Sequence, residues 1–280
     1  KAGMTSATRF PARFSAATVG LLALLTCLLL LSAGCAQRGT VPGTPTAEPI
    51  TDSDEPEARK RARIRVELAA GYFGEGQNTV ALDEIKLALQ ADPTYAPAYV
   101  LRGLVYMGMN NDPLAEESFQ RAMQLNPRDP DALHNYGWYA CQRGRYAQST
   151  ELFQRALASP VYGGQARTLL AMGICQIRAG QFVEAEASLA RSYELDPANP
   201  IVAYNLASLQ FRRGDDAKAQ FTIRRLNNTD LANAETLWLG IKVERRLRNR
   251  EAMAQLAQQL GRRYPDSAQW ARFQRGEFDE

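Results

Sequence analysis

One pattern recurs along this 280-residue chain at intervals of about 34 residues, six times between residues 62 and 265. Each copy has a large residue near its fourth position, glycine or alanine at the eighth, and mostly small residues at the twentieth and twenty-seventh. Small side chains let two helices approach closely, while proline and glycine between them end one helix before the next begins. The pattern therefore indicates helix–turn–helix units that bury their apolar faces on their neighbours.

This period and these positions resemble the tetratricopeptide repeat (TPR). They predict an all-α fold, a right-handed superhelical solenoid of six helix-turn-helix repeats. We expect the repeats at 62–95, 96–129, 130–165, 166–199, 200–232 and 233–265, followed by a C-terminal tail at 266–280. An array of this kind is a scaffold that holds other proteins, and it is rarely a catalyst.

Residues 1–34 are predicted to be a lipoprotein signal peptide. Three positive charges precede an uncharged apolar run at 19–31, which is shorter than the roughly 20 residues needed to span a bilayer. The run ends in Leu-Ser-Ala-Gly-Cys at 31–35, which resembles a bacterial lipobox with Ser32 where leucine is usual. We therefore predict lipidation of Cys35. The alternative is an ordinary secretory signal with a chance cysteine.

The residues after Cys35 bear on where the protein is held. Ala36 is not the aspartate associated with retention in the inner membrane, which favours the outer membrane, on its periplasmic face. Residues 35–60 are rich in proline, glycine, threonine and acidic side chains, and they have little apolar surface to bury. We predict a flexible periplasmic tether with a reach of roughly 25 Å.

The sequence offers little that could carry catalysis. It has one histidine, and it has no zinc-protease motif, paired-cysteine motif or glycine-rich phosphate loop. We expect no enzyme activity, catalytic residue, metal or cofactor. Residues 1–34 hold three of the 33 basic residues and none of the 30 acidic ones, so the remainder of the chain is neutral. A neutral protein disfavours nucleic acid as a partner, because nucleic acid binds basic surfaces.

Two cysteines fall in neighbouring repeats. Cys141 and Cys175 lie in the expected first helices of the third and fourth repeats. An oxidising compartment would permit a disulfide between them. However, both lie on faces expected to pack, and the Cα distance between two helices usually exceeds what a disulfide tolerates. The sequence therefore favours two free thiols and leaves their pairing open.

The first helices of a TPR array line its concave wall, and here the wall is apolar. The residues expected to form a groove for other proteins are Val66, Phe73, Val100, Leu104, Met107, His134, Trp138, Leu170, Ile174, Tyr204 and Phe211. An exposed apolar surface of this size fits an apolar or amphipathic segment of another protein. About half of the wall is expected to be buried between helices instead. The leading anchors are Phe73, Met107, Trp138 and Tyr204.

The last repeat carries a run of charges at 244–251 that includes four arginines. A solvated face that caps the end of the solenoid is the simpler interpretation. A docking patch for an acidic partner is the alternative.

Several stretches extend the similarity beyond the repeat pattern. They are Leu-His-Asn-Tyr-Gly at 133–137 with Gly-Arg-Tyr at 144–146, Ser-Pro-Val-Tyr at 159–162, Leu-Trp-Leu-Gly-Ile at 237–241, and Arg-Tyr-Pro-Asp-Ser at 263–267 with Phe-Gln at 273–274. Together with the lipobox and tether, they resemble the PilF/PilW family of type IV pilus biogenesis and stability lipoproteins. The departures are Ser32, the Pro-Val order at 160–161, and the tether segment at 51–60, which has no evident counterpart in the family.

The resemblance implies a pilotin role at the inner face of the outer membrane. Such proteins help secretin subunits reach that membrane and form the ring through which the pilus passes. The implied partners are a PilQ-like secretin subunit and the outer membrane, and we expect this protein to be a monomer. The alternative is a general envelope lipoprotein adaptor that recruits cell-wall enzymes.

Overall fold

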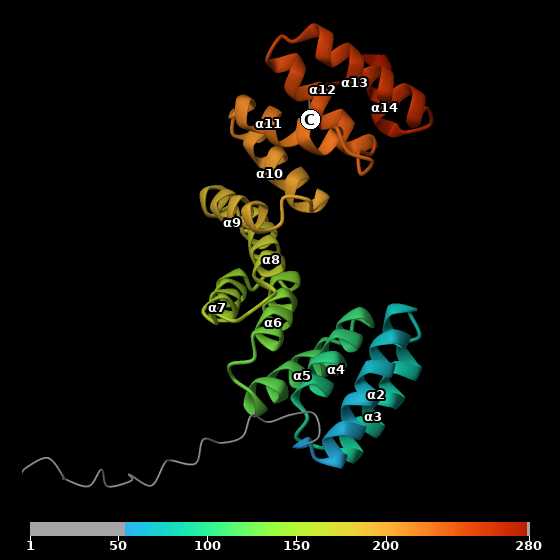
Figure 1. Cartoon of the computed structure of the whole chain (residues 1–280), viewed down its shortest axis with the longest axis vertical. Helices are drawn as coiled ribbons and strands as arrows, with labels where there is room; N and C mark the ends of the chain where they lie inside the picture. The colour runs from blue at the N-terminus through green and yellow to red at the C-terminus, as the bar shows by residue number, and fades with distance from the viewer. Residues whose placement is uncertain (1–53, 279–280) are drawn as a thin grey trace, which may run out of the picture. The chain divides into compact units, whose positions relative to one another are not determined.

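The fold is built from helices that pair in the order of the chain. The computed structural model describes residues 54–278, and within them there are thirteen α-helices and no strand (Figure 1). The predicted signal peptide, Cys35 and the tether up to residue 53 lie outside the described residues. From α2 onwards, each even-numbered helix packs with the next helix as a helix–turn–helix, which confirms an all-helical TPR array.

Six such pairs are followed by one more helix. The pairs are α2 (Glu57–Gly74) with α3 (Asn78–Ala91), α4 (Ala96–Gly108) with α5 (Asp112–Leu125), α6 (Pro130–Gln142) with α7 (Tyr146–Leu157), α8 (Gln165–Arg178) with α9 (Phe182–Leu195), α10 (Pro200–Arg212) with α11 (Asp216–Asn227), and α12 (Ala234–Arg246) with α13 (Arg250–Arg263). The last helix is α14 (Ala268–Arg275).

Glycine allows the two helices of a pair to approach where they cross. A Cβ atom built on Gly103 of α4 would lie 2.8 Å from the ring of Phe119 in α5. The same atom on Gly173 of α8 would lie 2.7 Å from Leu189 of α9. Real Cβ atoms do not come this close, so only glycine fits at these crossings. The small residue at the eighth position of the repeat is thus explained by packing.

Polar residues fix where the helices begin. The side chains of Asp129 and Asn199 accept backbone N–H bonds at the starts of α6 and α10, and a proline follows each of them. Asn233 and Thr236 bond reciprocally as a capping box at the start of α12. These caps satisfy N–H groups that would otherwise lack partners at the end of a helix.

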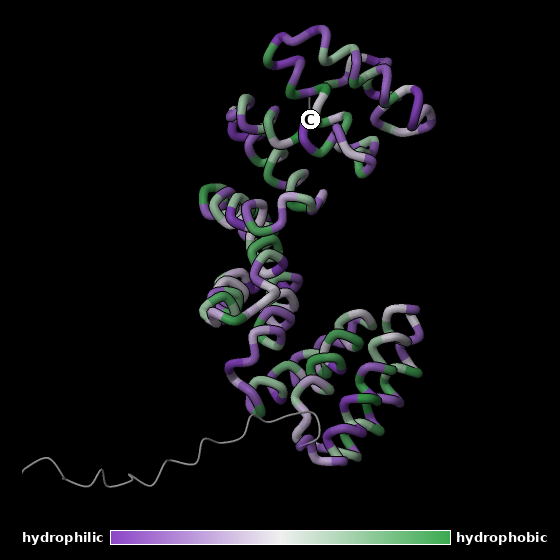
Figure 2. Tube along the Cα trace, viewed as in Figure 1, coloured by the Kyte–Doolittle hydropathy of each residue, from purple (hydrophilic) through white to green (hydrophobic). Residues whose placement is uncertain are grey.

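The hydrophobic core is divided into clusters that follow the chain. One cluster around Phe119 and Leu133 joins α4 to α7, and another around Leu237 and Leu260 joins α12 to α14. Apolar residues are accordingly spread over all helix pairs (Figure 2). Each repeat therefore depends on its neighbours for burial, as in other solenoids.

The structure differs from the sequence-based boundaries at both ends. Helix α2 begins at Glu57, so residues 57–60 are helical although their composition placed them in the tether. Residues 268–275, predicted to belong to a tail, form α14. Its Trp270 and Phe273 pack with α12 and α13, and a Cβ atom on Gly261 of α13 would meet the Trp270 ring at 2.8 Å. None of the described helices is both long and apolar enough to cross a membrane.

Candidate protein-binding surfaces

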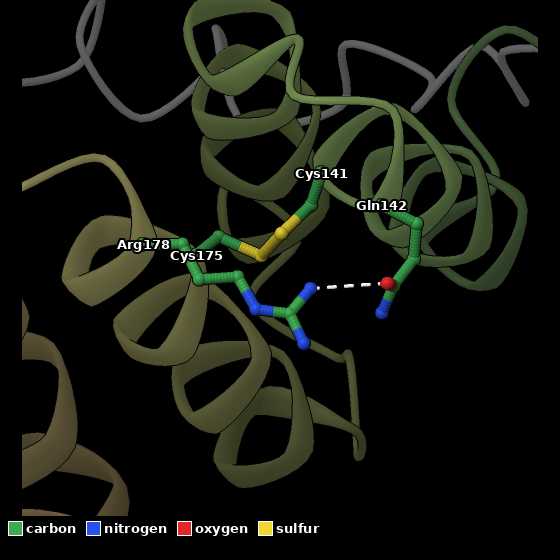
Figure 3. The surroundings of a disulfide bond; sticks show 4 residues. All are labelled: Cys141, Gln142, Cys175 and Arg178. Atoms are coloured by element: carbon green, nitrogen blue, oxygen red, sulfur yellow. Dashed lines mark hydrogen bonds between the residues drawn. A yellow bond between two sulfur atoms is a disulfide. The ribbon is translucent and has the colours of Figure 1, made fainter.

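A disulfide joins the third and fourth helix pairs, and the expectation of two free thiols was wrong. Cys141 of α6 and Cys175 of α8 are bonded, with their Cα atoms 5.8 Å apart (Figure 3). The two helices pack directly on one another at this point, which brings the Cα atoms within the range that a disulfide spans. Both cysteines are buried, and beside them Arg178 donates a hydrogen bond of 3.0 Å to the side-chain oxygen of Gln142.

His134 is in the interior, although the sequence suggested a groove position. Its side chain is 7% exposed, and its Nδ1 lies 2.8 Å from the hydroxyl of Thr168 in α8. That hydroxyl also lies 3.0 Å from the hydroxyl of Tyr162, which is buried in the long connection between α7 and α8. Arg167 donates to the same tyrosine oxygen at 3.2 Å. These contacts fix the long connection onto α8, so the role of His134 is structural.

The environment of His134 disfavours its charged form. Burial is the main cause, and the positive charge of Arg167 adds to it, although Asp131 acts in the opposite direction. Together they lower the pKa of His134 from 6.5 to about 4. The imidazole is therefore neutral at neutral pH.

The other ten residues expected in the groove divide by burial. Val100 is buried at 9% exposure, so like His134 it offers little surface to a partner. Nine are half-buried: Val66, Phe73, Leu104, Met107, Trp138, Leu170, Ile174, Tyr204 and Phe211. Most pack against the core clusters of their own or the neighbouring helix pair. Each keeps part of its side chain accessible, which is compatible with a partner-binding wall.

Two of these residues share a pocket near the C-terminus. Tyr204 and Phe211 of α10 line a pocket of about 260 Å³ together with Trp238 of α12. We call it the C-terminal pocket; its other lining residues are Ser208, Arg212, Glu235, Leu239, Lys242, Gln269 and Arg272. It is formed by α10, α12 and α14.

Cations lie close to the aromatic rings of this pocket. The Lys242 ammonium is 5.7 Å from the ring centre of Phe211 and 5.9 Å from that of Trp238. The Arg246 guanidinium lies 4.0 Å from the Phe211 ring and also pairs with Asp216 at 2.6 Å. The pocket therefore combines aromatic surface with positive charge.

Sequence reasoning missed Trp238 and the contribution of α14. Trp238 stands one position after the position expected to face the wall in the last repeat. In addition, the predicted groove residues extended only to Phe211 in α10. The apolar spacing of Trp270 and Phe273, with Ser267 ahead of them as a helix cap, was the available signal for α14. No group of His, Cys, Asp or Glu side chains suited to hold a metal ion occurs within residues 54–278.

Comparisons with known proteins agree with this architecture. Tetratricopeptide-repeat family models match residues 96–129, 118–151 and 176–236. The type IV pilus assembly protein PilF of Pseudomonas aeruginosa is 25% identical over 224 residues, which cover 80% of this chain and 88% of that protein. The crystal structure of PilW, a widely conserved type IV pilus biogenesis factor, is similar with a TM-score of 0.68 at 30% identity. That match covers 76% of this chain and 98% of the PilW chain.

A solved structure of PilF from Pseudomonas aeruginosa shares the fold, with a TM-score of 0.70 at 24% identity over 78% of this chain and 99% of that one. The helix pairs and their half-buried wall thus define a TPR scaffold, a non-enzymatic class of protein. Within that class, the identity to PilW extends over nearly all of the PilW chain. The chain belongs to the PilF/PilW family of TPR proteins of type IV pilus biogenesis.

Proposed function

We propose that this protein is an outer-membrane lipoprotein scaffold that promotes the localisation and multimerisation of the secretin in type IV pilus biogenesis. Family membership carries the proposal, through 30% identity to PilW over 98% of that chain. The lipid on Cys35 would hold the protein at the membrane, and the TPR wall would hold part of the secretin subunit until the ring forms.

The disulfide gives independent support for a location outside the cytoplasm. Cys141 and Cys175 are both buried and bonded to each other. Structural disulfides persist in the periplasm and other oxidising compartments, and they are rare where thioredoxin and glutathione keep thiols reduced. The bond is therefore most simply explained if the protein is exported, which agrees with the predicted signal peptide.

The wall supports binding to an apolar or amphipathic segment. Trp138 is half-buried, packs against the cluster that contains the disulfide, and lies with its ring centre 5.6 Å from the Arg178 guanidinium. Aromatic side chains in such settings often supply much of the energy of an interface. A secretin segment with apolar side chains on one face fits this surface.

Capture from envelope extracts tests the partner. The tagged protein is expected to enrich the secretin over other outer-membrane proteins. Enrichment of cell-wall enzymes with no secretin would contradict the proposal and favour the general adaptor.

Fractionation tests the anchor. The Cys35→Ser variant is expected to leave the outer membrane and to appear in the soluble periplasmic fraction, because it has no thiol for lipid. Cys27→Ser is the matched control, since Cys27 lies in the predicted apolar run and not at the lipobox end. Outer-membrane retention of the Cys35→Ser variant would refute the anchor.

A further inference from the structure

The C-terminal pocket has a combination of side chains that the secretin proposal does not use. Its inner surface includes three aromatic rings, from Tyr204, Phe211 and Trp238. These rings come from two different helix pairs, so they are held by the packing of α10 on α12. Trp238 is 5% exposed and belongs to the core cluster of the last repeat, which makes this part of the pocket rigid.

The charged residues around these rings are mostly positive. Arg212, Lys242 and Arg272 line the pocket, while Glu235 is the one carboxylate among its lining residues. The pocket formed by α9, α10 and α11 is balanced, with Glu194 against Lys218. Two further pockets each have one more positive than negative lining residue: one has Lys86 and Arg102 against Asp83, and the other has Arg191 alone. The C-terminal pocket, with three cations against one carboxylate, has the larger positive excess.

Next to the pocket, Trp238 already packs against an aromatic side chain of this chain. Phe278 follows α14 and stacks on Trp238, with ring centres 5.3 Å apart and an interplanar angle of 23°. The guanidinium of Arg245 lies 4.1 Å from the Phe278 ring centre. An aromatic ring thus lies close to both an indole and a cation of α12, and each of these contacts is favourable for the ring.

We propose that the C-terminal pocket binds an acidic peptide segment of another protein that carries an aromatic side chain. The aromatic residue packs against Tyr204 and Phe211, which are half-buried, beside Lys242, and its acidic neighbours meet the exposed Arg212. Complementary charge steers such a segment to the pocket, and the accessible parts of the Tyr204 and Phe211 rings supply the contact that retains it. This proposal does not depend on the secretin role, because it specifies the chemistry of a segment and not the protein that supplies it.

Titration calorimetry with synthetic peptides tests the proposal on the protein that comprises residues 36–280. The first probe is a short peptide of alternating aspartate and phenylalanine; the second has lysine in place of aspartate, and the third has glycine in place of phenylalanine. We expect the first to bind, with an affinity that falls as salt is added, and the other two to bind at least about tenfold more weakly.

Charge reversal locates the site. Arg212→Glu and Lys242→Glu are each expected to weaken binding of the first peptide by about tenfold or more. Arg191→Glu is the matched control, because Arg191 is an exposed arginine of α9 that lines a different pocket. Arg212 is exposed and is the last residue of α10, so we expect Arg212→Glu to fold. This variant therefore tests the site even if Lys242→Glu does not fold. Unchanged affinity in both pocket variants, equal binding of the lysine peptide, or no binding of the first peptide to the unaltered protein would each overturn the proposal.

Discussion

At the scale of single residues, His134 shows how a position that looks functional can be structural. It is the one histidine of the chain, and its ring is held by Thr168 from one side with the Phe153 ring centre 5.8 Å away on another. Because these contacts join α6, α7 and α8, its protonation state affects the junction of the third and fourth repeats.

The His134→Asn variant is expected to flatten the pH dependence of stability in mildly acidic solution. The folded pKa of about 4 lies below the ordinary value of 6.5, so the unfolded chain binds more protons between these values. The stabilising effect of neutral His134 is present above pH 6.5 and is lost as the pH falls towards 4. From this residue alone, the free energy of unfolding should be about 2 kcal/mol lower near pH 5 than near pH 7.5.

Urea denaturation of both proteins at the two pH values measures this difference. The titration of the single imidazole by NMR gives the pKa directly, since one histidine gives one set of ring signals. A midpoint near 6.5 would contradict the buried environment described for His134.

Trp138 is the residue at which the proposed wall is most directly tested. Trp138→Ala should reduce the affinity for the secretin by about tenfold or more, because truncation of a central interface aromatic typically has this effect. Phe221→Ala is the matched control, because Phe221 is 63% exposed but lies on α11, the second helix of its pair, and the wall is formed by the first helices. Surface plasmon resonance with the purified periplasmic part of the secretin measures both. Equal affinities for the two variants, with both folded, would place the site elsewhere.

At the scale of helices and their connections, the contact between α6 and α8 is reinforced in two ways. The disulfide closes a separation of 34 residues, and the cluster of His134, Tyr162 and Thr168 fixes the long connection between α7 and α8. The junction of the third and fourth repeats is therefore held by a covalent bond as well as by packing.

Reduction of the disulfide should destabilise the array. A closed loop of this length is expected to contribute about 3–4 kcal/mol through the entropy of the unfolded chain. Urea denaturation with and without dithiothreitol measures the loss in the unaltered protein. The Cys141→Ala/Cys175→Ala variant serves as the control, since its stability should not respond to the reductant. A response in that variant, or none in the unaltered protein, would contradict this role of the bond.

The crossing of α4 and α5 offers a second test of packing. Gly103→Ala should lower the free energy of unfolding by about 1–3 kcal/mol, because the added methyl group meets the Phe119 ring. Gly71→Ala in α2 is the control: a Cβ atom there has no neighbour within 4 Å, and alanine favours the helix by up to about 1 kcal/mol. The two substitutions should thus have opposite signs in urea denaturation. The same sign for both would contradict the close crossing.

The helix pairs could be predicted from the periodicity of the sequence, whereas the disulfide and the burial of individual wall residues depend on distances between helices and could not. The spacing of Gly103, Gly137 and Gly173 was enough to predict paired helices, because each lies at the crossing within a repeat. The Cys141–Cys175 bond was not predictable, because it requires the approach of two first helices, which no local pattern reports. His134 and Val100 share the spacing of wall residues, but neighbouring side chains cover them.

At the scale of the whole molecule, the predicted anchor and the candidate binding surfaces lie in different parts of the chain. The predicted lipid site at Cys35 lies outside the described residues, whereas the candidate binding surfaces lie within the helical array from Glu57 to Arg275. Loss of the lipid should therefore change where the protein acts and leave its helices folded.

The amount of assembled secretin in the outer membrane tests whether this protein promotes secretin assembly at that membrane. Heat-resistant secretin multimers are measured by immunoblot in membrane fractions of cells with the intact gene, cells without it, and cells that carry the Cys35→Ser variant. We expect multimers to be lost from the outer membrane without the protein and to be restored there by the unaltered chain, but not by Cys35→Ser. Multimers at the normal level in the outer membrane of cells that lack the protein would contradict this role.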